Sequence, residues 1–162
     1  MHLRKTMKLL HTVASAGLIG GLMAYGVLLV YAPQDTLSRY ADMRQSIMYV
    51  SNYVLLPSLG IALVTGLLSM AVHPPFQEKR WAWIKALLGI GMFEATLGII
   101  GSKADYAAKI SAKIASGETD AALLKNALAT EWSSLFAIMA LSIANVVLGV
   151  WRPALTARRA AP

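Results

Sequence analysis

The chain has 162 residues, of which 57% are hydrophobic and 14% charged, and its mean hydropathy of +0.56 predicts a membrane protein in contact with the lipid bilayer rather than a soluble domain. Its net charge is +7, but basic residues that flank apolar runs are explained by orientation in a membrane, which argues against a nucleic-acid partner. The lack of cysteine excludes disulfides, thiolate metal sites and cysteine nucleophiles.

Four charge-poor stretches mark the membrane spans. About 20 apolar residues cross the hydrocarbon, and a charge at its centre costs about 2.5 to 3.5 kcal/mol on insertion scales. The sequence therefore predicts an all-α membrane protein, a four-transmembrane-helix up-down bundle that forms a single integral membrane domain over residues 1–162. The predicted spans cover about 10–32, 50–72, 81–102 and 132–151.

The first span follows a basic start and has features of a secretory signal, because Ala14-Ser15-Ala16 is similar to a cleavage site. The apolar run continues well beyond this site to Tyr31. We therefore expect a retained first span rather than a cleaved signal peptide.

The connections on the two sides of the membrane differ. The segment His73-Pro74-Pro75-Phe76 predicts a tight turn between the second and third spans. On the opposite side, Asp35 or Thr36 is expected to cap a helix that runs without a break to Tyr53 and is only kinked at Pro57.

The third span is predicted to continue as a helix past Gly101 and to end at Ser116-Gly117, because apolar residues recur every four positions: Tyr106, Ile110 and Ile114. Residues 118–129 are expected to restart a helix that feeds the fourth span. At about 1.5 Å per residue, helices of about 32 to 37 residues exceed the hydrocarbon thickness, so long outer helical extensions should project by about 15 Å or more.

The distribution of Lys and Arg predicts the orientation. The side that holds both termini and the loop between the second and third spans carries nine of these residues: Arg4, Lys5, Lys8, Lys79, Arg80, Lys85, Arg152, Arg158 and Arg159. The opposite side carries six, diluted by five acidic residues. The positive-inside rule then places the N- and C-termini in the cytoplasm, and the expected location is a bacterial inner membrane.

Polar side chains are predicted near the cytoplasmic surface, with His11 at the start of the first span, His73 at the end of the second and Lys85 at the start of the third. Asn145 lies about one to two turns deeper. An imidazole at membrane depth indicates a haem axial ligand or a metal ligand, and His11 is the candidate ligand. The alternative is an interfacial histidine with a lysine that reaches to water.

Glu94 is the only charged residue between Ala86 and Ser102 in the third span and lies about 20 Å from the inner boundary. An isolated carboxylate is costly there, so we expect a neutral, hydrogen-bonded carboxyl group with Tyr25 as its candidate partner. A proton-handling or quinone-side role and a purely structural role are both open. Glu131, beside Trp132, is interpreted as an interfacial residue in the first turn of its span.

Two further patterns have simple explanations in packing. The chain has eight methionines, which raises a copper hypothesis because thioethers suit Cu(I), but there is no MxxM cluster and core filling is favoured. Gly17 and Gly21 form a GxxxG motif, for which packing within the bundle is favoured over dimerisation.

Three groups of residues resemble a known set of families: Leu10-His11 with Gly20-Gly21, Leu56-Pro57 with Thr65-Gly66-Leu67, and Trp81-x-Trp83-Ile84-Lys85. They are similar to small integral membrane families that include the CopD-type copper-resistance domain, the HemJ-type protoporphyrinogen oxidases and membrane proteins of unassigned function. In the HemJ-type oxidases a first-span histidine and a lysine four residues after a tryptophan are associated with haem, and His11 and Lys85 match them. Leu18 stands where those oxidases have a tryptophan, and the third span carries Glu94 rather than a histidine.

These observations lead to three hypotheses. The leading one is an inner-membrane protein that binds haem b near the cytoplasmic leaflet, with His11 as ligand and Lys85 or His73 opposite, for electron transfer or porphyrin oxidation. The rival is a cofactor-free accessory or scaffold subunit whose outer helices bind a membrane-protein partner or a second copy. The third is a copper-handling protein.

Overall fold

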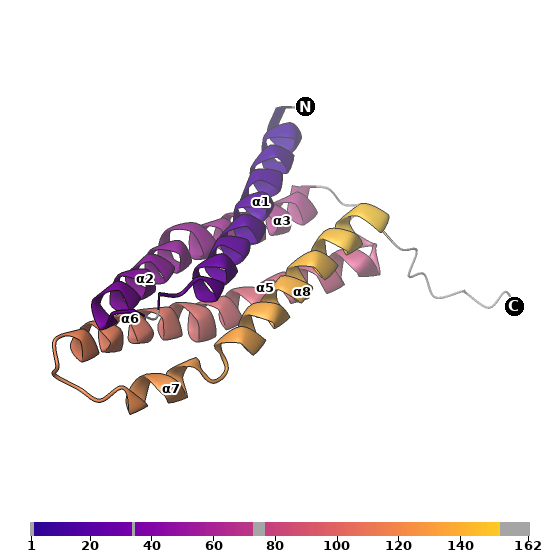
Figure 1. The fold of residues 1–162 in the computed structure, drawn as a ribbon. Coiled ribbons are helices and arrows are strands. Elements are labelled where there is room, and N and C mark those ends of the chain that lie inside the picture. The colour runs from indigo at the N-terminus through magenta and orange to yellow at the C-terminus, as the bar shows by residue number, and fades with distance from the viewer. Residues whose placement is uncertain (1, 34, 73–76, 153–162) are drawn as a thin grey trace, which may run out of the picture.

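The computed structural model describes residues 2–33, 35–72 and 77–152, and within these ranges the chain is all-α (Figure 1). The elements in chain order are α1 (His2–Val30), α2 (Leu37–Val50), η1 (Ser51–Leu55), α3 (Leu56–Val72), α5 (Arg80–Ala95), η2 (Thr96–Gly101), α6 (Ser102–Ala115), α7 (Ala122–Leu128) and α8 (Glu131–Trp151). The start of α1 and the end of α8 lie at one end of the bundle, here called the terminal end. The elements α2, α6 and α7 lie at the other, the hairpin end. The predicted up-down bundle is confirmed.

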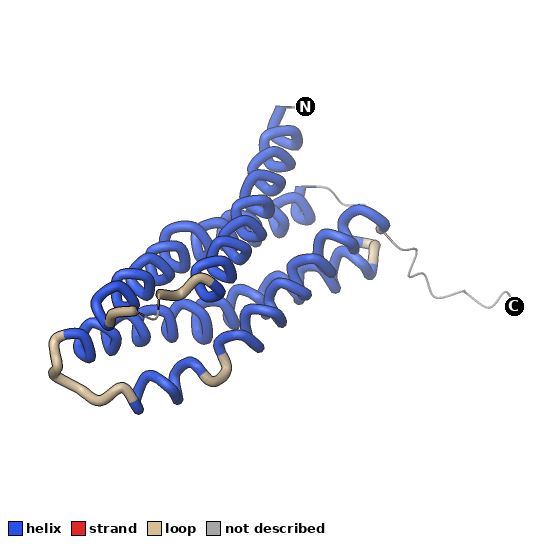
Figure 2. Tube along the Cα trace, viewed as in Figure 1, coloured by secondary structure: helices blue, strands red, loops and turns tan. Residues whose placement is uncertain are grey.

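Two of the passes are long helices interrupted only by a π-helical segment (Figure 2). One helix covers Leu37–Val72 and the other Arg80–Ala115, and each has 36 residues. At about 1.5 Å per residue each is about 54 Å long, against a hydrocarbon thickness of about 30 Å. Both helices are therefore longer than the hydrocarbon layer is thick, as predicted.

As predicted, the second pass continues through Pro57. It follows η1, where the N–H of Leu56 bonds to the carbonyl of Ser51. Proline has no N–H to donate, and the wider π-helical turn directly before it accommodates this gap in the hydrogen-bond ladder. The helix continues through it to Val72.

The helix ends follow local sequence signals. Thr36 is the N-cap of α2, because its hydroxyl oxygen accepts a bond of 3.3 Å from the N–H of Arg39. After α6, Gly117 has φ +79° and the N–H of Glu118 donates to the carbonyl of Lys113 at 2.9 Å. Both predicted ends are confirmed, and the second needs glycine because of its positive φ.

One prediction about the hairpin end holds only in part. The helix restarted after Gly117 is the short α7, and it does not continue into the fourth pass because Thr130 leaves helical geometry and its carbonyl accepts bonds from the hydroxyls of Ser133 and Ser134. Of the apolar residues that predicted α6, Ile114 is buried and Tyr106 is exposed. The residues of α6 that are buried are mostly small, which lets α2 approach closely: Ala104, Ala107, Ala108, Ser111 and Ile114.

The GxxxG motif of α1 packs within the bundle, as predicted. A Cβ atom added at Gly21 would lie 2.7 Å from Cδ2 of Leu55, and one at Gly17 would lie 2.6 Å from Oγ of Ser58. These glycines therefore allow α1 to pack closely on η1 and α3. Gly20, between them, has no such neighbour within 4 Å.

The outside of the bundle is apolar along all four passes. Each pass contains a helix long and apolar enough to span a membrane. Large hydrophobic side chains such as Leu9, Val13, Leu87 and Phe136 point outward rather than into the core. This arrangement suits contact with lipid hydrocarbon, in agreement with the predicted membrane class.

Candidate functional site

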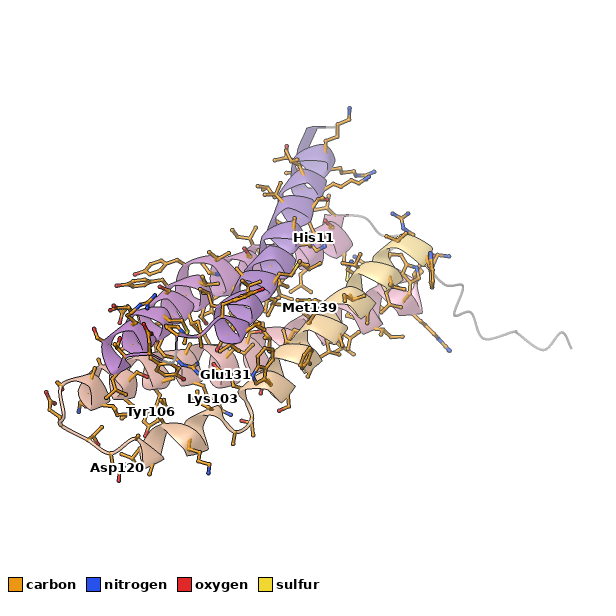
Figure 3. All side chains as sticks on the ribbon, viewed as in Figure 1. His11, Lys103, Tyr106, Asp120, Glu131 and Met139 are labelled. Atoms are coloured by element: carbon orange, nitrogen blue, oxygen red, sulfur yellow. The ribbon has the colours of Figure 1, made fainter. Side chains whose placement is uncertain are left out.

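His11 lies on α1 in the half of the bundle toward the terminal end, where it faces α3 (Figure 3). Its Nδ1 is 2.8 Å from the carbonyl oxygen of Ala62 and 3.2 Å from the hydroxyl oxygen of Thr65. A carbonyl oxygen only accepts hydrogen bonds, so Nδ1 carries the proton and donates it. The other ring nitrogen, Nε2, keeps its lone pair and is the atom that a metal or a donor would meet.

The sequence Thr65-Gly66 explains how the imidazole fits against α3. The hydroxyl of Thr65 donates to the carbonyl of Ile61 at 2.6 Å, so its oxygen is free to accept from His11. A Cβ atom at Gly66 would lie 3.4 Å from Cε1 of His11. The threonine therefore supplies an acceptor, and the ring lies at van der Waals distance from the Cβ position of Gly66.

Lys85 is the second predicted site residue and lies at the terminal end on α5. It is half-buried, and a Cβ atom added at Gly149 would lie 2.6 Å from its Nζ. Its ammonium group thus lies against the backbone of α8, and it is close enough to His11 for an electrostatic interaction. His73, the third predicted member of this site, lies outside the described residues.

A second group of polar residues, at the hairpin end, was missed by the sequence analysis. Arg44 on α2 and Glu131 at the start of α8 are only 3% and 6% exposed. Nη1 of Arg44 lies 2.8 and 3.0 Å from the two carboxylate oxygens of Glu131. Glu131 lies in the first turn of α8, as predicted, and the structure adds that it is a buried ion-pair partner.

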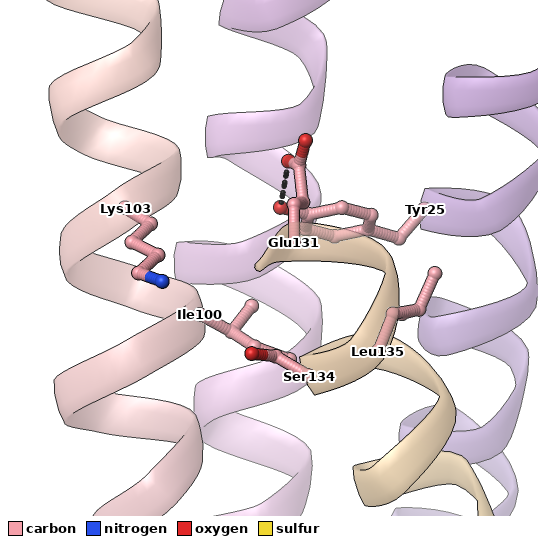
Figure 4. Close-up of a pocket in the computed structure, with 6 residues that line it drawn as sticks. All are labelled: Tyr25, Ile100, Lys103, Glu131, Ser134 and Leu135. Atoms are coloured by element: carbon pink, nitrogen blue, oxygen red, sulfur yellow. Dashed lines mark hydrogen bonds between the residues drawn. The ribbon is translucent and has the colours of Figure 1, made fainter. Parts of the chain in front are cut away.

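Two tyrosines complete this buried pair. The hydroxyl of Tyr25 donates to Oε1 of Glu131 at 2.7 Å (Figure 4). The hydroxyl of Tyr40 accepts from Nε and Nη2 of Arg44 at 2.9 and 2.7 Å. The resulting cluster of Tyr25, Tyr40, Arg44 and Glu131, called the hairpin network below, joins α1, α2 and α8.

The hairpin network leaves little room for a ligand. The cavity beside it has a volume of about 10 Å³ and is lined in part by Tyr25, Lys103 and Glu131. Such a volume holds at most about one water molecule. Lys103 bonds to the hydroxyl of Thr130 at its edge. The geometry therefore fits a structural role, because each charged group of the pair is already bonded to protein atoms.

The expectation that Glu94 is buried and bonded to Tyr25 is wrong. Tyr25 points to Glu131, whereas Glu94 is exposed on α5. Met92 and Thr96 are the buried positions on either side of Glu94. Glu94 is two positions from each of them, which places it on the opposite face of the helix. Among the described residues, none forms a hydrogen bond or ion pair with Glu94.

Asn145 is half-buried on α8 and bonds through Nδ2 to the sulfur of Met92 at 3.8 Å. Its amide oxygen is buried without a partner among the described residues. The methionines that raised the copper hypothesis do not gather around Asn145. Met92 is in the core, whereas Met23 is exposed on α1.

In comparisons with known proteins, no family model, no curated protein and no solved structure matches the chain. The resemblance to the CopD-type and HemJ-type families therefore stays a prediction. The functional argument depends on the geometry described above.

Proposed function

We propose that the chain is an integral membrane protein that binds haem b at the terminal end of its bundle, with His11 as an axial ligand. The observation that carries the proposal is the bond from Nδ1 of His11 to the carbonyl of Ala62. Histidines that bind metals almost always donate the other ring N–H to such an acceptor, which fixes the tautomer and the ring orientation. The residues present therefore fit an iron ligand at Nε2.

Each neighbouring residue has a definable task under this proposal. The carbonyl of Ala62 increases the basicity of the imidazole and holds its ring in place. Gly66 keeps the ring close to α3. The Lys85 ammonium lies at the same end, where it is suited to pair with a propionate carboxylate. When bound, haem b supplies one-electron redox chemistry at its iron.

Electron transfer is favoured over porphyrin oxidation as the activity. Leu18 stands at the position of a tryptophan in the HemJ-type oxidases, and here it is buried in the hydrophobic core. An aliphatic side chain offers neither a ring to stack on a porphyrin nor a donor for a hydrogen bond.

A visible spectrum of the purified full chain, oxidised and then reduced, tests the proposal. We expect a Soret band and sharp reduced α and β bands for the wild-type protein, loss of these bands in His11→Ala and a weaker or shifted Soret band in Lys85→Ala. His2→Ala is the matched control and should keep the full spectrum. In His73→Ala, a change from six- to five-coordinate spectra would identify His73 as the second ligand. A folded but colourless wild-type protein, expressed with haem supplied, would contradict the proposal.

The proposed orientation has both termini in the cytoplasm of a bacterium and the chain in the inner membrane. It is supported by nine basic residues on the side of the termini against six on the other. Reporter fusions at the C-terminus test it. A reporter active only on the outer side would reverse the orientation.

The second candidate is a cofactor-free scaffold subunit. It is favoured by the hairpin network, which fixes α2 to α8 and would give the projecting helices a rigid shape. Copper handling has weaker support, because Met92 is buried in the core whereas Met23 is exposed on α1. A folded, colourless protein that captures a membrane partner only when α2 and α6 are intact would favour the scaffold.

A further inference from the structure

The exposed carboxyl group of Glu94 lies deep in the predicted hydrocarbon layer. On α8, Trp132 and Trp151 are 19 residues apart, or about 28 Å, which matches the thickness of the hydrocarbon. Asn145 lies about 9 Å inside Trp151 and bonds to Met92, which fixes the level of α5. Glu94, two residues beyond Met92, therefore lies between the levels of Trp132 and Trp151.

A carboxyl group at this depth needs a partner. Water does not reach it through lipid, and none of the described residues of the chain bonds to it. Unpaired polar groups in hydrocarbon are costly, and ionisable ones within membrane helices usually pair with another group. Because the described residues supply no partner for Glu94, the geometry points to one from outside the bundle.

The surface around Glu94 has the pattern of a helix-packing face. Five exposed residues recur at alternating spacings of three and four along one side of α5 and η2: Ile84, Leu87, Gly91, Glu94 and Gly98. Over α5, from Ile84 to Glu94, this is the spacing of a left-handed helix pair, and Gly98 lies in the π-helical segment that follows. A Cβ atom added at Gly91 or Gly98 would meet nothing within 4 Å, so a second helix can approach the backbone on either side of Glu94.

We propose that this face of α5 is the interface of a symmetric dimer and that its occupant is the same face of a second copy of the chain. In a parallel pair related by a two-fold axis along the membrane normal, each residue near the axis meets its own copy. The two Glu94 carboxyl groups then meet between the glycines. As carboxylic acids they are self-complementary, because each O–H donates to the carbonyl oxygen of the other.

This complementarity selects a second copy as the occupant. A polar residue at one core position of a helix pair also fixes the register, which an all-apolar face of leucine and glycine would not do. The inference is independent of haem binding, since His11 faces α3 whereas Glu94 faces away from the bundle.

Disulfide cross-linking tests the dimer, and the chain is suited to it because it has no cysteine of its own. Leu87→Cys probes the proposed face, and Phe136→Cys on α8 is the matched control because the two side chains are 66% and 65% exposed. The purified full-length variants are reconstituted in phosphatidylcholine vesicles at low protein density and oxidised. We expect dimers of twice the chain mass from Leu87→Cys and at least five times fewer from Phe136→Cys.

Two variants then test the role of the carboxyl group. In the Leu87→Cys background, Glu94→Gln should keep the cross-linking within about twofold, because paired amides also exchange hydrogen bonds. Glu94→Leu should lower it at least fivefold, and circular dichroism of each variant verifies that it is folded. Equal cross-linking by Leu87→Cys and Phe136→Cys, or equal cross-linking in Glu94→Leu and wild type, would overturn the proposal.

Discussion

The two ends of the bundle differ in how completely their buried polar groups are bonded to protein atoms. At the hairpin end, the charges of Arg44 and Glu131 are almost fully buried and each is bonded to protein atoms. At the terminal end, His11 is half-buried and only one of its two ring nitrogens is bonded to the described residues. The hairpin end thus holds its charges in a closed set of bonds, whereas Nε2 of His11 has no bond to the described residues, as the proposed haem site requires.

The largest expected effect comes from removing one partner of the buried pair. Glu131→Leu leaves the Arg44 guanidinium buried without a counter-charge, so we expect the free energy of unfolding to fall by about 3 to 5 kcal/mol. Denaturation in detergent followed by circular dichroism measures it. The double variant Arg44→Met with Glu131→Leu should recover at least half of the loss, because two apolar side chains leave no orphaned charge.

The exposed pair of Asp35 and Arg39 is the control for this prediction. Its two side chains are 50% and 67% exposed, with Asp35 directly before the N-cap of α2 and Arg39 in the first turn of that helix. Arg39→Ala should leave the unfolding transition unchanged, because solvent screens exposed pairs. An equally small effect of Glu131→Leu would contradict the structural role of the hairpin network.

A smaller effect at the same end is expected for Tyr25→Phe. This change removes one hydrogen bond to the Glu131 carboxylate but keeps the ring and the bonds from Arg44. We expect a loss of about 1.5 kcal/mol in the free energy of unfolding, the lower range for a bond to a charged group. A loss as large as that in Glu131→Leu would mean that the tyrosine, rather than the arginine, satisfies the carboxylate.

At the terminal end, the comparison predicts a small effect on stability and a larger one on binding. In Gly66→Val the new side chain meets the imidazole of His11, which is 3.4 Å from the Cβ position. The free energy of unfolding should stay within about 1 kcal/mol of that of Gly20→Val, whose Cβ meets nothing. Haem affinity should fall by about tenfold or more in Gly66→Val alone, equal to about 1.4 kcal/mol. Equal haem affinities of Gly66→Val and Gly20→Val would show that Gly66 is not part of the site.

The features that could be predicted from the sequence are local ones. Span positions follow from the length of apolar runs, and the ends at Thr36 and Gly117 follow from capping residues. The pairing of His11 with the Thr65-Gly66 segment was not predicted, although each residue was noted. It depends on how α1 is rotated against α3, which no single segment encodes.

The hairpin network shows why tertiary rotation limits such predictions. Arg44 and Glu131 are 87 positions apart, and each could have been placed at the membrane surface. The sequence did contain one signal for this pair. Arg44 and Glu131 each stand directly before a charge-free run, so they are predicted at the same height along the bundle, and their charges are opposite. Glu94 shows the reverse case, because its place in the third pass was predicted from the sequence but its helix face was not.

Haem titration of the purified full chain in detergent, followed at the Soret maximum, tests the central claim most directly. Wild type and Tyr25→Phe should show the same saturable increase, because the hairpin network takes no part in binding. His11→Ala should show no saturable increase while its unfolding transition stays close to that of wild type. Equal titrations of wild type and His11→Ala, or a loss of binding in Tyr25→Phe alone, would contradict the division of the bundle into a stabilising end and a binding end.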